Sequence, residues 1–377
     1  MRIAIVHDYI KEYGGAERVL EELIKIYPDA HIYTSVYIPE YLGPHRDRFK
    51  KYKIRTSFLQ NIPFKAKLIS PMRLAAPLAF MNMDLSRYDR IIVSQTGAYF
   101  PSLVPKSKDQ RLICYTHTPP RYLYGYMTAR DWKSNTFKRV IGNIMNHFLR
   151  MVDFYASKNV DVFIANSEEV AKRIKKFYRR EATVIYPPVS ISDQRSATSD
   201  KQSFYLTGGR LAMAKGTDII IDAFIKNGKP LKVFGKGFAG FEEKLKTKAH
   251  GKPNIEFLGE VSDDEKLRLM AGSIAFVFSS FDEDFGITPV EAMGTGTPVI
   301  AFKSGGVTET VVEGKTGLFY EANTPFALNK AINSFEKLKI RPEDCRQQAK
   351  KFSPKEFDMK IKKIVEENYN SEFRIQD

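Results

Sequence analysis

The chain has 377 residues, of which 43% are hydrophobic, 12% aromatic and 27% charged. This length predicts two domains, and a composition so rich in apolar and aromatic residues excludes a disordered chain. The formal charge is +15, from 59 Lys and Arg against 44 Asp and Glu, and the absence of any run of about 18 apolar residues argues against a membrane-spanning helix.

Apolar strands and helices alternate through the first half of the chain. Residues 2–6 form a short apolar run, and a Gly-Gly turn then leads into a helical pattern whose apolar residues share one face. Further strands are expected at residues 90–94, 111–116, 160–165 and 183–186. Ser167 is a predicted N-cap, because two acidic residues follow it in the first turn of a helical pattern.

The polar stretch 189–203 lacks periodicity and predicts a linker, after which the alternation returns. Capping-box patterns at Ser262 with Glu265 and at Ser353 with Glu356 predict two helix starts. We therefore expect two doubly wound α/β domains that face each other across a cleft, with ligands at the carboxyl ends of the strands. Strands of the second half are expected near residues 204–207, 232–234, 255–258, 274–278, 299–302 and 318–320.

The segment FDEDFGITPVEAMG places Glu283 in a loop after a buried strand and Glu291 on the first turn of the next helix. Both carboxylates are then expected to point into one pocket. Between them, Phe285, Gly286 and Ile287 offer backbone N–H groups at a helix start, which predicts an anion site. A sugar nucleotide has both the phosphates and the hydroxyls that such a pocket would bind. The alternative, which applies to most Glu pairs at this spacing, is two exposed surface residues.

Two more strand-to-helix junctions carry candidate ligand-binding residues. In GGRLAMAKG, Arg210 and Lys215 flank a short loop, and two cations there suit a diphosphate, although a basic surface turn is the alternative. In KEYGGAERVL, Gly14 and Gly15 would let the backbone approach a phosphate closely.

The segment CYTHTPPRYLY ends a strand at His117 and continues through two prolines. The prolines fix the backbone, so the His117 side chain is expected to project into the cleft, unless it is one of the many histidines with only a structural role. Arg121 follows in the same turn.

Together these segments resemble the retaining glycosyltransferases of family 4, which have the GT-B fold of two facing Rossmann-like domains. The resemblance covers nearly the whole chain and rests most on the Glu-x7-Glu segment with EAMGTGTPVIA, then on GRLAMAKG, GGAERVL and THTPPRYLY. It implies an N-terminal, acceptor-side domain of residues 1–188 and a nucleotide-sugar-binding domain of residues 189–353. A final helix, 354–377, is expected to cross back to the first domain.

The resemblance also implies roles for individual residues. Glu283 would hold hydroxyls of the donor sugar and Glu291 the ribose, while His117 would lie beside the transferred sugar. The remaining expected contacts are Arg210 and Lys215 on the diphosphate, Gly14 and Gly15 closing over it, Val261 and Asp263 at the base, and Arg121 on the acceptor or sugar side. The segment GGVTE also matches the family, but no role is assigned to it here.

The family implies retention of anomeric configuration without a metal or other cofactor. The letters DED at 282–284 are similar to the metal-binding Asp-x-Asp of the other glycosyltransferase fold, but their place inside the Glu-x7-Glu segment argues against that function. The segment HTPPRYLY, together with TSFLQNIPF and DLSRYDRIIVSQT, resembles the sequences of a subgroup that makes bacterial surface polysaccharides by mannosyl transfer from GDP-mannose. Alternatives are a UDP-sugar donor (glucose or N-acetylglucosamine) or a GT-B nucleotide-sugar epimerase.

The charge distribution bears on the acceptor. Residues 1–188 hold 31 Lys or Arg against 17 Asp or Glu, whereas residues 189–377 hold 28 against 27. Segment 58–83 mixes apolar residues with Lys65, Lys67 and Arg73, which predicts an anionic membrane surface and a lipid-linked or polysaccharide acceptor. An ordinary helix pair is the alternative for this segment. A nucleic-acid-binding protein is favoured by charge alone and leaves the paired carboxylates unexplained, so no nucleic acid is expected.

The expected location is cytoplasmic, peripheral on the inner face of the plasma membrane. Cys114 and Cys345 lie far apart in the sequence, which predicts neither a disulfide framework nor a zinc cluster and favours a reducing compartment. The first apolar run is too short for the core of a signal peptide.

Overall fold

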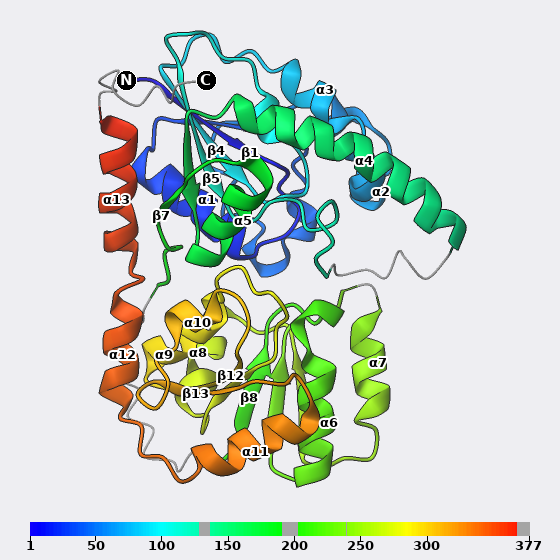
Figure 1. The fold of residues 1–377 in the computed structure, drawn as a ribbon, viewed down its shortest axis with the longest axis vertical. Helices are drawn as coiled ribbons and strands as arrows, with labels where there is room; N and C mark the ends of the chain where they lie inside the picture. Colours follow the sequence, from blue (N-terminus) through cyan, green and yellow to red (C-terminus); the bar gives the residue numbers. More distant parts are fainter. Residues whose placement is uncertain (128–135, 191–202, 239, 368–377) are drawn as a thin grey trace.

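The computed structural model describes residues 1–127, 136–190, 203–238 and 240–367, with two α/β domains that lie one above the other in Figure 1. Each domain is built on one parallel sheet covered by helices, so the predicted doubly wound GT-B architecture is confirmed.

The N-terminal domain is assembled around a seven-stranded sheet. Its strands are β1 (Ile3–His7), β2 (His31–Thr34), β3 (Ile54–Thr56), β4 (Arg90–Gln95), β5 (Arg111–Thr116), β6 (Val162–Ala165) and β7 (Thr183–Val184). They are parallel, in the order β3-β2-β1-β4-β5-β6-β7. The helices are α1 (Gly15–Ile26), α2 (Lys65–Met72), α3 (Ala76–Met81), α4 (Thr136–Lys158) and α5 (Glu168–Tyr178), with 3₁₀ turns at Pro39–Tyr41, Gly43–His45, Phe58–Asn61 and Pro101–Leu103.

The C-terminal domain is assembled around a six-stranded sheet. Its strands are β8 (Tyr205–Gly208), β9 (Leu231–Phe234), β10 (Ile255–Gly259), β11 (Phe276–Phe278), β12 (Val299–Phe302) and β13 (Gly317–Tyr320). They are parallel, in the order β10-β9-β8-β11-β12-β13. The helices are α6 (Thr217–Asn227), α7 (Phe241–Lys248), α8 (Asp263–Ala271), α9 (Ile287–Thr295), α10 (Val307–Thr310), α11 (Pro325–Phe335), α12 (Pro342–Lys350) and α13 (Pro354–Glu366), with a 3₁₀ turn at Met213–Lys215.

The strands are apolar on both faces because helices cover both sides of each sheet. Along β1, Ala4 and Val6 join one core cluster, while Ile3 and Ile5 join the cluster on the opposite face. Side chains alternate across a strand, so every β1 position from residue 3 to 6 is buried. This arrangement leaves the carboxyl ends of the strands as the place where polar side chains gather.

The predicted strands agree with the observed ones to within about two residues, and two strands escaped prediction. β2 and β3 have only four and three residues, and β3 is an edge strand with exposed side chains, so neither carries a strong apolar signal. Two predicted caps are confirmed, since Ser167 accepts a hydrogen bond from Val170 and Ser262 from Glu265. The capping box at Ser353 is wrong, because among the described residues the Ser353 side chain makes no capping hydrogen bond, although the helix does begin at Pro354.

The last helix lies against the N-terminal domain although it follows the C-terminal domain in sequence. In Figure 1, α12 runs beside the lower domain and α13 beside the upper one. Three α13 side chains, Phe357, Ile361 and Val365, are buried in the core cluster that contains α1 residues. The Phe357 ring packs edge-on against Tyr115, with ring centroids 5.7 Å apart. α13 ends at Glu366, and residues 368–377 of the expected helix lie outside the described residues.

Replacing Phe357 with Ala should therefore destabilise the N-terminal domain. Loss of a buried aromatic side chain and the resulting cavity are expected to lower its free energy of unfolding by about 3–5 kcal/mol. Urea unfolding followed by circular dichroism measures the effect. Met359→Ala on the exposed face of the same helix is the matched control and should change stability by less than about 0.5 kcal/mol. Equal stability of the Phe357→Ala variant and the unchanged chain would contradict this docking.

Candidate functional site

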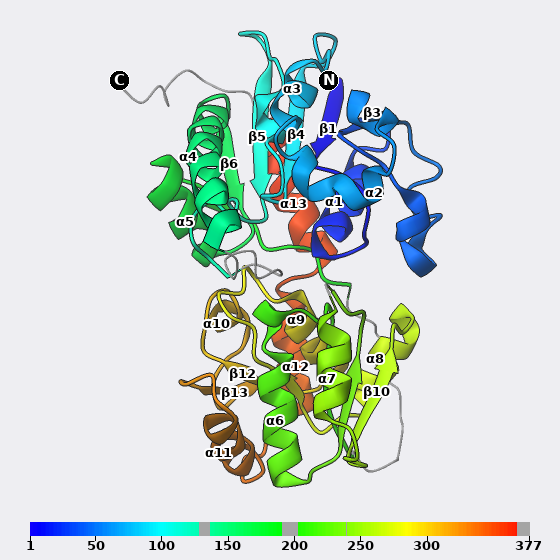
Figure 2. The ribbon, with the colours of Figure 1, turned by 90° about the vertical axis from the view of Figure 1, so that its right-hand side faces the viewer.

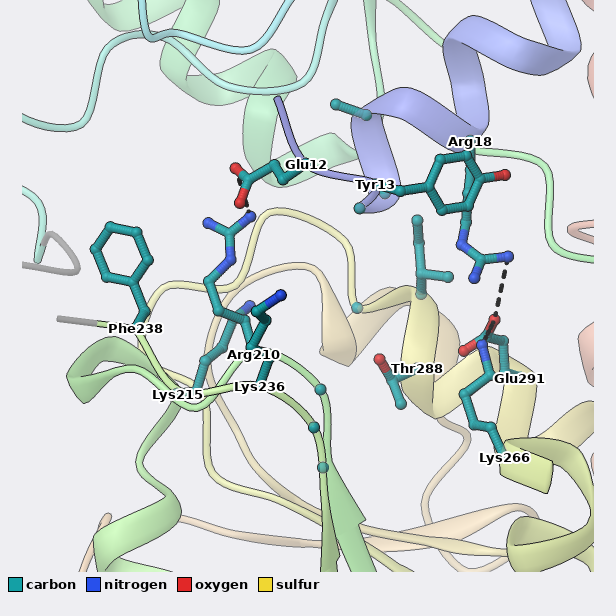
Figure 3. Close-up of a pocket in the computed structure, with 18 of the residues that line it drawn as sticks. Glu12, Tyr13, Arg18, Arg210, Lys215, Lys236, Phe238, Lys266, Thr288 and Glu291 are labelled. Atoms are coloured by element: carbon teal, nitrogen blue, oxygen red, sulfur yellow. Dashed lines mark hydrogen bonds and ion pairs between the residues drawn. The ribbon is translucent and has the colours of Figure 1, made fainter. Parts of the chain in front are cut away.

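A cavity of about 510 Å³ lies between the domains, at the carboxyl ends of strands from both sheets (Figure 3). Every residue that the sequence assigned to catalysis or to donor binding lines this cavity. Arg121 instead lines a neighbouring cavity of about 1130 Å³, and the two cavities share Gly14, Arg210 and Lys215 among their lining residues. The structure thus brings segments from both halves of the chain to one continuous cleft.

Arg210 and Lys215, the two residues predicted to bind the diphosphate, lie in the loop after β8, and each contacts a carboxylate. The Lys215 Nζ atom lies 2.7 Å from Glu283 Oε2, an oxygen that also accepts a hydrogen bond from Ser280. Burial would raise the pKa of Glu283, but Lys215 and these hydrogen bonds outweigh it and lower the pKa. Arg210 Nη2 lies 2.8 Å from Glu12 Oε1 of the other domain, as Figure 3 shows, and this carboxylate raises the pKa of Arg210.

The carboxylate of Glu291 lies at the other end of the cavity, in the second turn of α9 rather than the first. Its Oε1 atom is 2.7 Å from Lys266 Nζ and 4.0 Å from Arg18 Nη1 (Figure 3). Asp263 is held nearby by Arg18 at 2.7 Å and by Arg48 at 3.0 Å. Burial opposes ionisation of Asp263, but Arg18 and Lys266 outweigh it, so its pKa is strongly lowered.

The start of α9 opens onto the cavity between these two groups of charges. Its N-cap is Gly286, with φ of 91°, and among the described residues no side chain caps this helix start. The first backbone N–H groups of α9 are therefore available to an anion. Gly15 packs directly on this end of the helix, since a Cβ atom at Gly15 would lie 2.7 Å from Ile287 Cδ1.

His117 follows β5 at the wall of the cavity and is largely buried. Its Nε2 atom lies 3.0 Å from Ser94 Oγ. Burial and the neighbouring His7 lower the pKa of His117 to about 3. The imidazole is therefore uncharged at neutral pH, with one ring nitrogen that donates and one that accepts.

Asp284 joins the domains by pairing with arginines from the N-terminal domain. Its Oδ1 atom lies 2.9 Å from Arg121 Nη2 and 2.5 Å from Arg173 Nη1, and both arginines also donate to the Asp282 carbonyl oxygen. Burial opposes ionisation of Asp284, but the two guanidinium groups outweigh it and lower its pKa. Arg121 thus reaches the cleft through this interdomain contact.

The segment GGVTE, to which the sequence assigned no role, lies against the same loop. Cβ atoms at Gly305 and Gly306 would lie 2.2 Å and 2.4 Å from the backbone oxygens of Glu283 and Asp284, so only glycine fits. Glu309 accepts hydrogen bonds from the backbone N–H groups of residues 168 and 169 and thereby caps α5 of the other domain. The segment shapes the Glu283 loop and contributes to the domain contact.

Sequence reasoning missed several charged residues of this interface. Arg18 lies one helical turn after Gly15, and Lys266 lies three residues after Asp263, so helical spacing could have placed them near the predicted site. Glu12, Arg173 and the role of Asp284 had no such signal. Their partners come from the other domain, and nothing in the local sequence indicates that pairing.

Two parallel α/β domains that face each other across a cleft lined by cations, carboxylates and an open helix start define a glycosyltransferase of the GT-B fold. A model of Glycosyltransferase Family 4 matches residues 13–193, and a model of Glycosyl transferases group 1 matches residues 190–352. The chain therefore belongs to the glycosyltransferases that these two models together describe.

Curated relatives at modest identity include mannosyltransferases. The chain is 31% identical to an uncharacterized glycosyltransferase of Methanocaldococcus jannaschii over 56% of its own length and 61% of that protein. It is 24% identical to the alpha-1,3/1,6-mannosyltransferase ALG2 of Dictyostelium discoideum, over 89% of this chain and 84% of the relative. It is 28% identical to the lipopolysaccharide core biosynthesis mannosyltransferase LpcC of Rhizobium leguminosarum, over 64% of this chain and 76% of the relative.

The fold also matches solved structures. Anabaena HepE, in a complex with UDP and glucose, superposes with a TM-score of 0.73 at 19% identity, over 98% of this chain and 100% of that one. Within the described residues, no helix is long and apolar enough to cross a membrane, and no group of three or more His, Cys, Asp or Glu side chains is placed to hold a metal ion.

Replacing Asp284 with Asn should weaken the domain contact. It removes the counter-charge that two guanidinium groups share, and although the almost fully buried Arg173 keeps Glu169 as a partner, we expect the free energy of unfolding at pH 7 to fall by about 3 kcal/mol. The folded-state pKa of Asp284 is lowered below 3.8, so this stabilisation is present above that pH. It is lost as the pH falls from 3.8 through the lower folded value.

Urea unfolding of both proteins between pH 7 and pH 3 measures this difference. Asp264→Asn, an exposed position in the first turn of α8, is the control and should have little effect at any of these pH values. A stability difference that stays constant down to pH 3, or none at pH 7, would rule out the proposed ionic contribution of Asp284.

Proposed function

We propose that the chain transfers mannose from GDP-mannose, with retention of configuration, to a lipid-linked or polysaccharide acceptor in the synthesis of cell-surface glycans. The observation that carries the proposal is the common cavity, in which cations, two carboxylates and the start of α9 line one space of about 510 Å³. A cavity of this size suits a nucleotide sugar. The mannosyl donor is supported by the mannosyltransferase relatives and by the HTPPRYLY segment.

The donor would lie along the cavity with its diphosphate between Arg210 and Lys215 and the start of α9. Lys215 has three N–H donors and Arg210 has five, so each can contact a phosphate oxygen while it keeps its carboxylate partner. Gly14 and Gly15 would cover the diphosphate from the other domain. Glu283 would accept from sugar hydroxyls and Glu291 from the ribose, with Val261 and Asp263 at the base.

The transfer requires that the bond between the anomeric carbon and the diphosphate oxygen breaks while the acceptor oxygen bonds to the same face of that carbon. Negative charge then develops on the leaving nucleoside diphosphate, where preorganised cations and helix-end N–H groups stabilise it. We propose that a donor phosphate oxygen takes the proton of the acceptor hydroxyl, since His117 is uncharged and no side chain is assigned as a nucleophile.

Metal independence is part of this proposal. Arg210 and Lys215 supply the positive charge that a divalent ion would otherwise bring to the diphosphate. The DED segment has another use here, because the Asp284 carboxylate pairs with Arg121 and Arg173. Activity in excess chelator is therefore expected.

The acceptor side is proposed to face an anionic membrane on the cytoplasmic side. The cavity of about 1130 Å³ is lined by Ser70 and Arg73 near α2 and by Met145 and Leu149 of α4, and in Figure 2 α4 lies at the left of the N-terminal domain and α2 to the right of its centre. The helices that contribute to this cavity, and α3 next to them in the chain, also carry exposed apolar side chains. They are Phe64, Leu68, Leu74, Leu78 and Met81 around α2 and α3, and Val140, Ile144, Phe148, Met151 and Tyr155 along one face of α4.

The structure also bears on two alternatives from the sequence analysis, an ordinary helix pair for segment 58–83 and nucleic-acid binding for the basic N-terminal half. Met72, Ala76 and Phe80 are buried in the core, so segment 58–83 packs on the sheet as an ordinary helix pair would and also exposes apolar side chains. Part of the N-terminal positive charge is engaged across the cleft, where Arg18, Arg48, Arg121 and Arg173 pair with C-terminal carboxylates. This weakens the electrostatic argument for nucleic-acid binding.

A panel of GDP-mannose, UDP-glucose and UDP-N-acetylglucosamine tests the donor. GDP-mannose is expected to raise the melting temperature most, because a ligand that binds only the folded state stabilises it. Lys215→Met should lower kcat/KM by about 100-fold, since it removes a charge that acts on the leaving group. Lys248→Met on α7, which removes a lysine paired with Asp222 outside the cavity, is the control.

Two results would overturn parts of the proposed function. Stabilisation by a UDP-sugar alone would overturn the GDP-mannose donor, and a product of inverted anomeric configuration would overturn the retaining mechanism. Release of free nucleotide without a glycosylated product would instead favour an epimerase.

Flotation with phosphatidylglycerol liposomes at low salt tests the membrane proposal. The protein should float with the vesicles and be released by salt, because the attraction is partly electrostatic. Phe148→Glu should weaken binding to the vesicles about tenfold, as expected when one aromatic side chain no longer inserts into the membrane. Met359→Glu, an equally apolar exposed position on α13, should bind as the unchanged chain does. A protein that stays unbound at low salt would contradict the proposal.

A further inference from the structure

A row of buried polar side chains connects His117 to the helix that carries the Gly14-Gly15 turn. His117 Nε2 lies 3.0 Å from Ser94 Oγ, and the same Oγ lies 3.0 Å from His7 Nδ1. His7 Nε2 lies 3.7 Å from Glu17 Oε1 of α1, and Glu17 Oε2 accepts a hydrogen bond from the Gly14 backbone N–H at 2.8 Å. His7 ends β1 and pairs in register with Ser94, one residue before the end of β4, so the fold places them side by side.

These side chains are shielded from water, so the positions of the protons on the two imidazoles and on the Ser94 hydroxyl are set by the neighbouring side chains. His7 and Ser94 are fully buried, and Glu17 and His117 nearly so. A serine hydroxyl has one proton and two lone pairs, so it can donate to at most one of the two imidazoles. If one histidine accepts that proton, the other must donate its N–H to Ser94 Oγ.

Glu17 decides which histidine donates. Burial would raise the pKa of Glu17, but the nearby His7 imidazole and the hydrogen bond from the Gly14 N–H outweigh it and lower the pKa, so the carboxylate is ionised at neutral pH. His7 Nε2 has no hydrogen-bond partner among the described residues, and the Glu17 carboxylate lies 3.7 Å from it. A lone pair facing a carboxylate is repelled and an N–H is attracted, so a neutral His7 carries its proton on Nε2.

We propose that Glu17, His7 and Ser94 are positioning residues that fix the tautomer of His117. The His7 Nδ1 atom accepts the Ser94 proton, and Ser94 Oγ in turn accepts from His117 Nε2–H. The Nδ1 atom of His117 is then the unprotonated nitrogen, and it is the one left for a ligand in the cleft.

The consequence for catalysis rests on the proposed function. His117 would accept a hydrogen bond from a hydroxyl of the donor sugar and would neither give nor take a proton during the transfer. The hydroxyl recognised in this way must be a donor in the hydrogen bond. The relay, as we call the row His117, Ser94, His7 and Glu17, also connects the sugar side of the cleft to the turn that would cover the diphosphate, because Glu17 contacts both His7 and the Gly14 N–H.

Long-range ¹H–¹⁵N correlation spectra of the full chain labelled with ¹⁵N-histidine test the proton positions directly. The spectra are recorded at pH 8, and the signals are assigned with His7→Gln and His117→Gln variants. We expect both histidines to be neutral with the proton on Nε2. A His117 protonated on Nδ1, or a doubly protonated His7, would overturn this arrangement; both states are read from the unchanged chain, and the variants serve only to assign its signals.

The Ser94→Ala variant tests the bridge. It should leave His117 without its fixed tautomer, so the two nitrogen signals move toward average values. Ser102→Ala removes another buried hydroxyl, one that contacts Gln95 and Cys114, and should leave the His117 signals unchanged. A His117 spectrum unaffected by Ser94→Ala would exclude a positioning function for Ser94.

Binding separates this inference from the proposed function. Ser94→Ala should weaken binding of GDP-mannose about fivefold and leave binding of GDP unchanged, because GDP lacks the sugar that His117 would contact. Equal losses for both ligands would contradict a role at the sugar. If neither ligand binds the unchanged chain, the GDP-mannose proposal fails, and the histidine spectra still decide the relay.

Discussion

The pairing of Asp284 with Arg121 and Arg173 is the interaction on which the geometry of the cleft depends. Asp284 lies one residue after Glu283, so the contact that joins the domains also positions the carboxylate proposed to hold the sugar. Arg173 is almost fully buried, and a buried guanidinium without its counter-charge costs several kcal/mol. The relative placement of the two sheets and the shape of the candidate site are therefore parts of one electrostatic arrangement.

The surplus of positive charge in the first half of the chain takes on a specific meaning in this arrangement. Arginines of the N-terminal domain face Asp263, Asp284 and Glu291 of the C-terminal domain, and Arg210 faces Glu12 in the opposite direction. Ionic contacts of this kind join the two walls of the cleft. They also leave charged groups on those walls, where a charged ligand would contact them. These contacts differ from the apolar core, where α13 joins the N-terminal domain through Phe357 and its neighbours.

The cleft separates two electrostatic environments within one cavity. Near Arg210 and Lys215, several N–H donors remain available to an anion, and the start of α9 adds its own backbone donors. His117, in contrast, is uncharged because it is buried, so it offers a neutral hydrogen bond. A ligand with a charged diphosphate and an uncharged sugar matches this division, which is the physical basis of the function proposed above.

The amino-acid sequence by itself determined the alternation of strands and helices, the parallel sheets and the segments that line the cleft. Local periodicity and the glycine-rich turns encode these features, as at Gly14, Gly15 and the Glu283 to Glu291 segment. Only the tertiary structure decided that Asp284 pairs with Arg121 and Arg173, that Glu309 caps α5, and that Ser94 lies between His7 and His117. Those contacts join residues far apart in the chain, and their energies depend on burial and distance, which no local pattern contains.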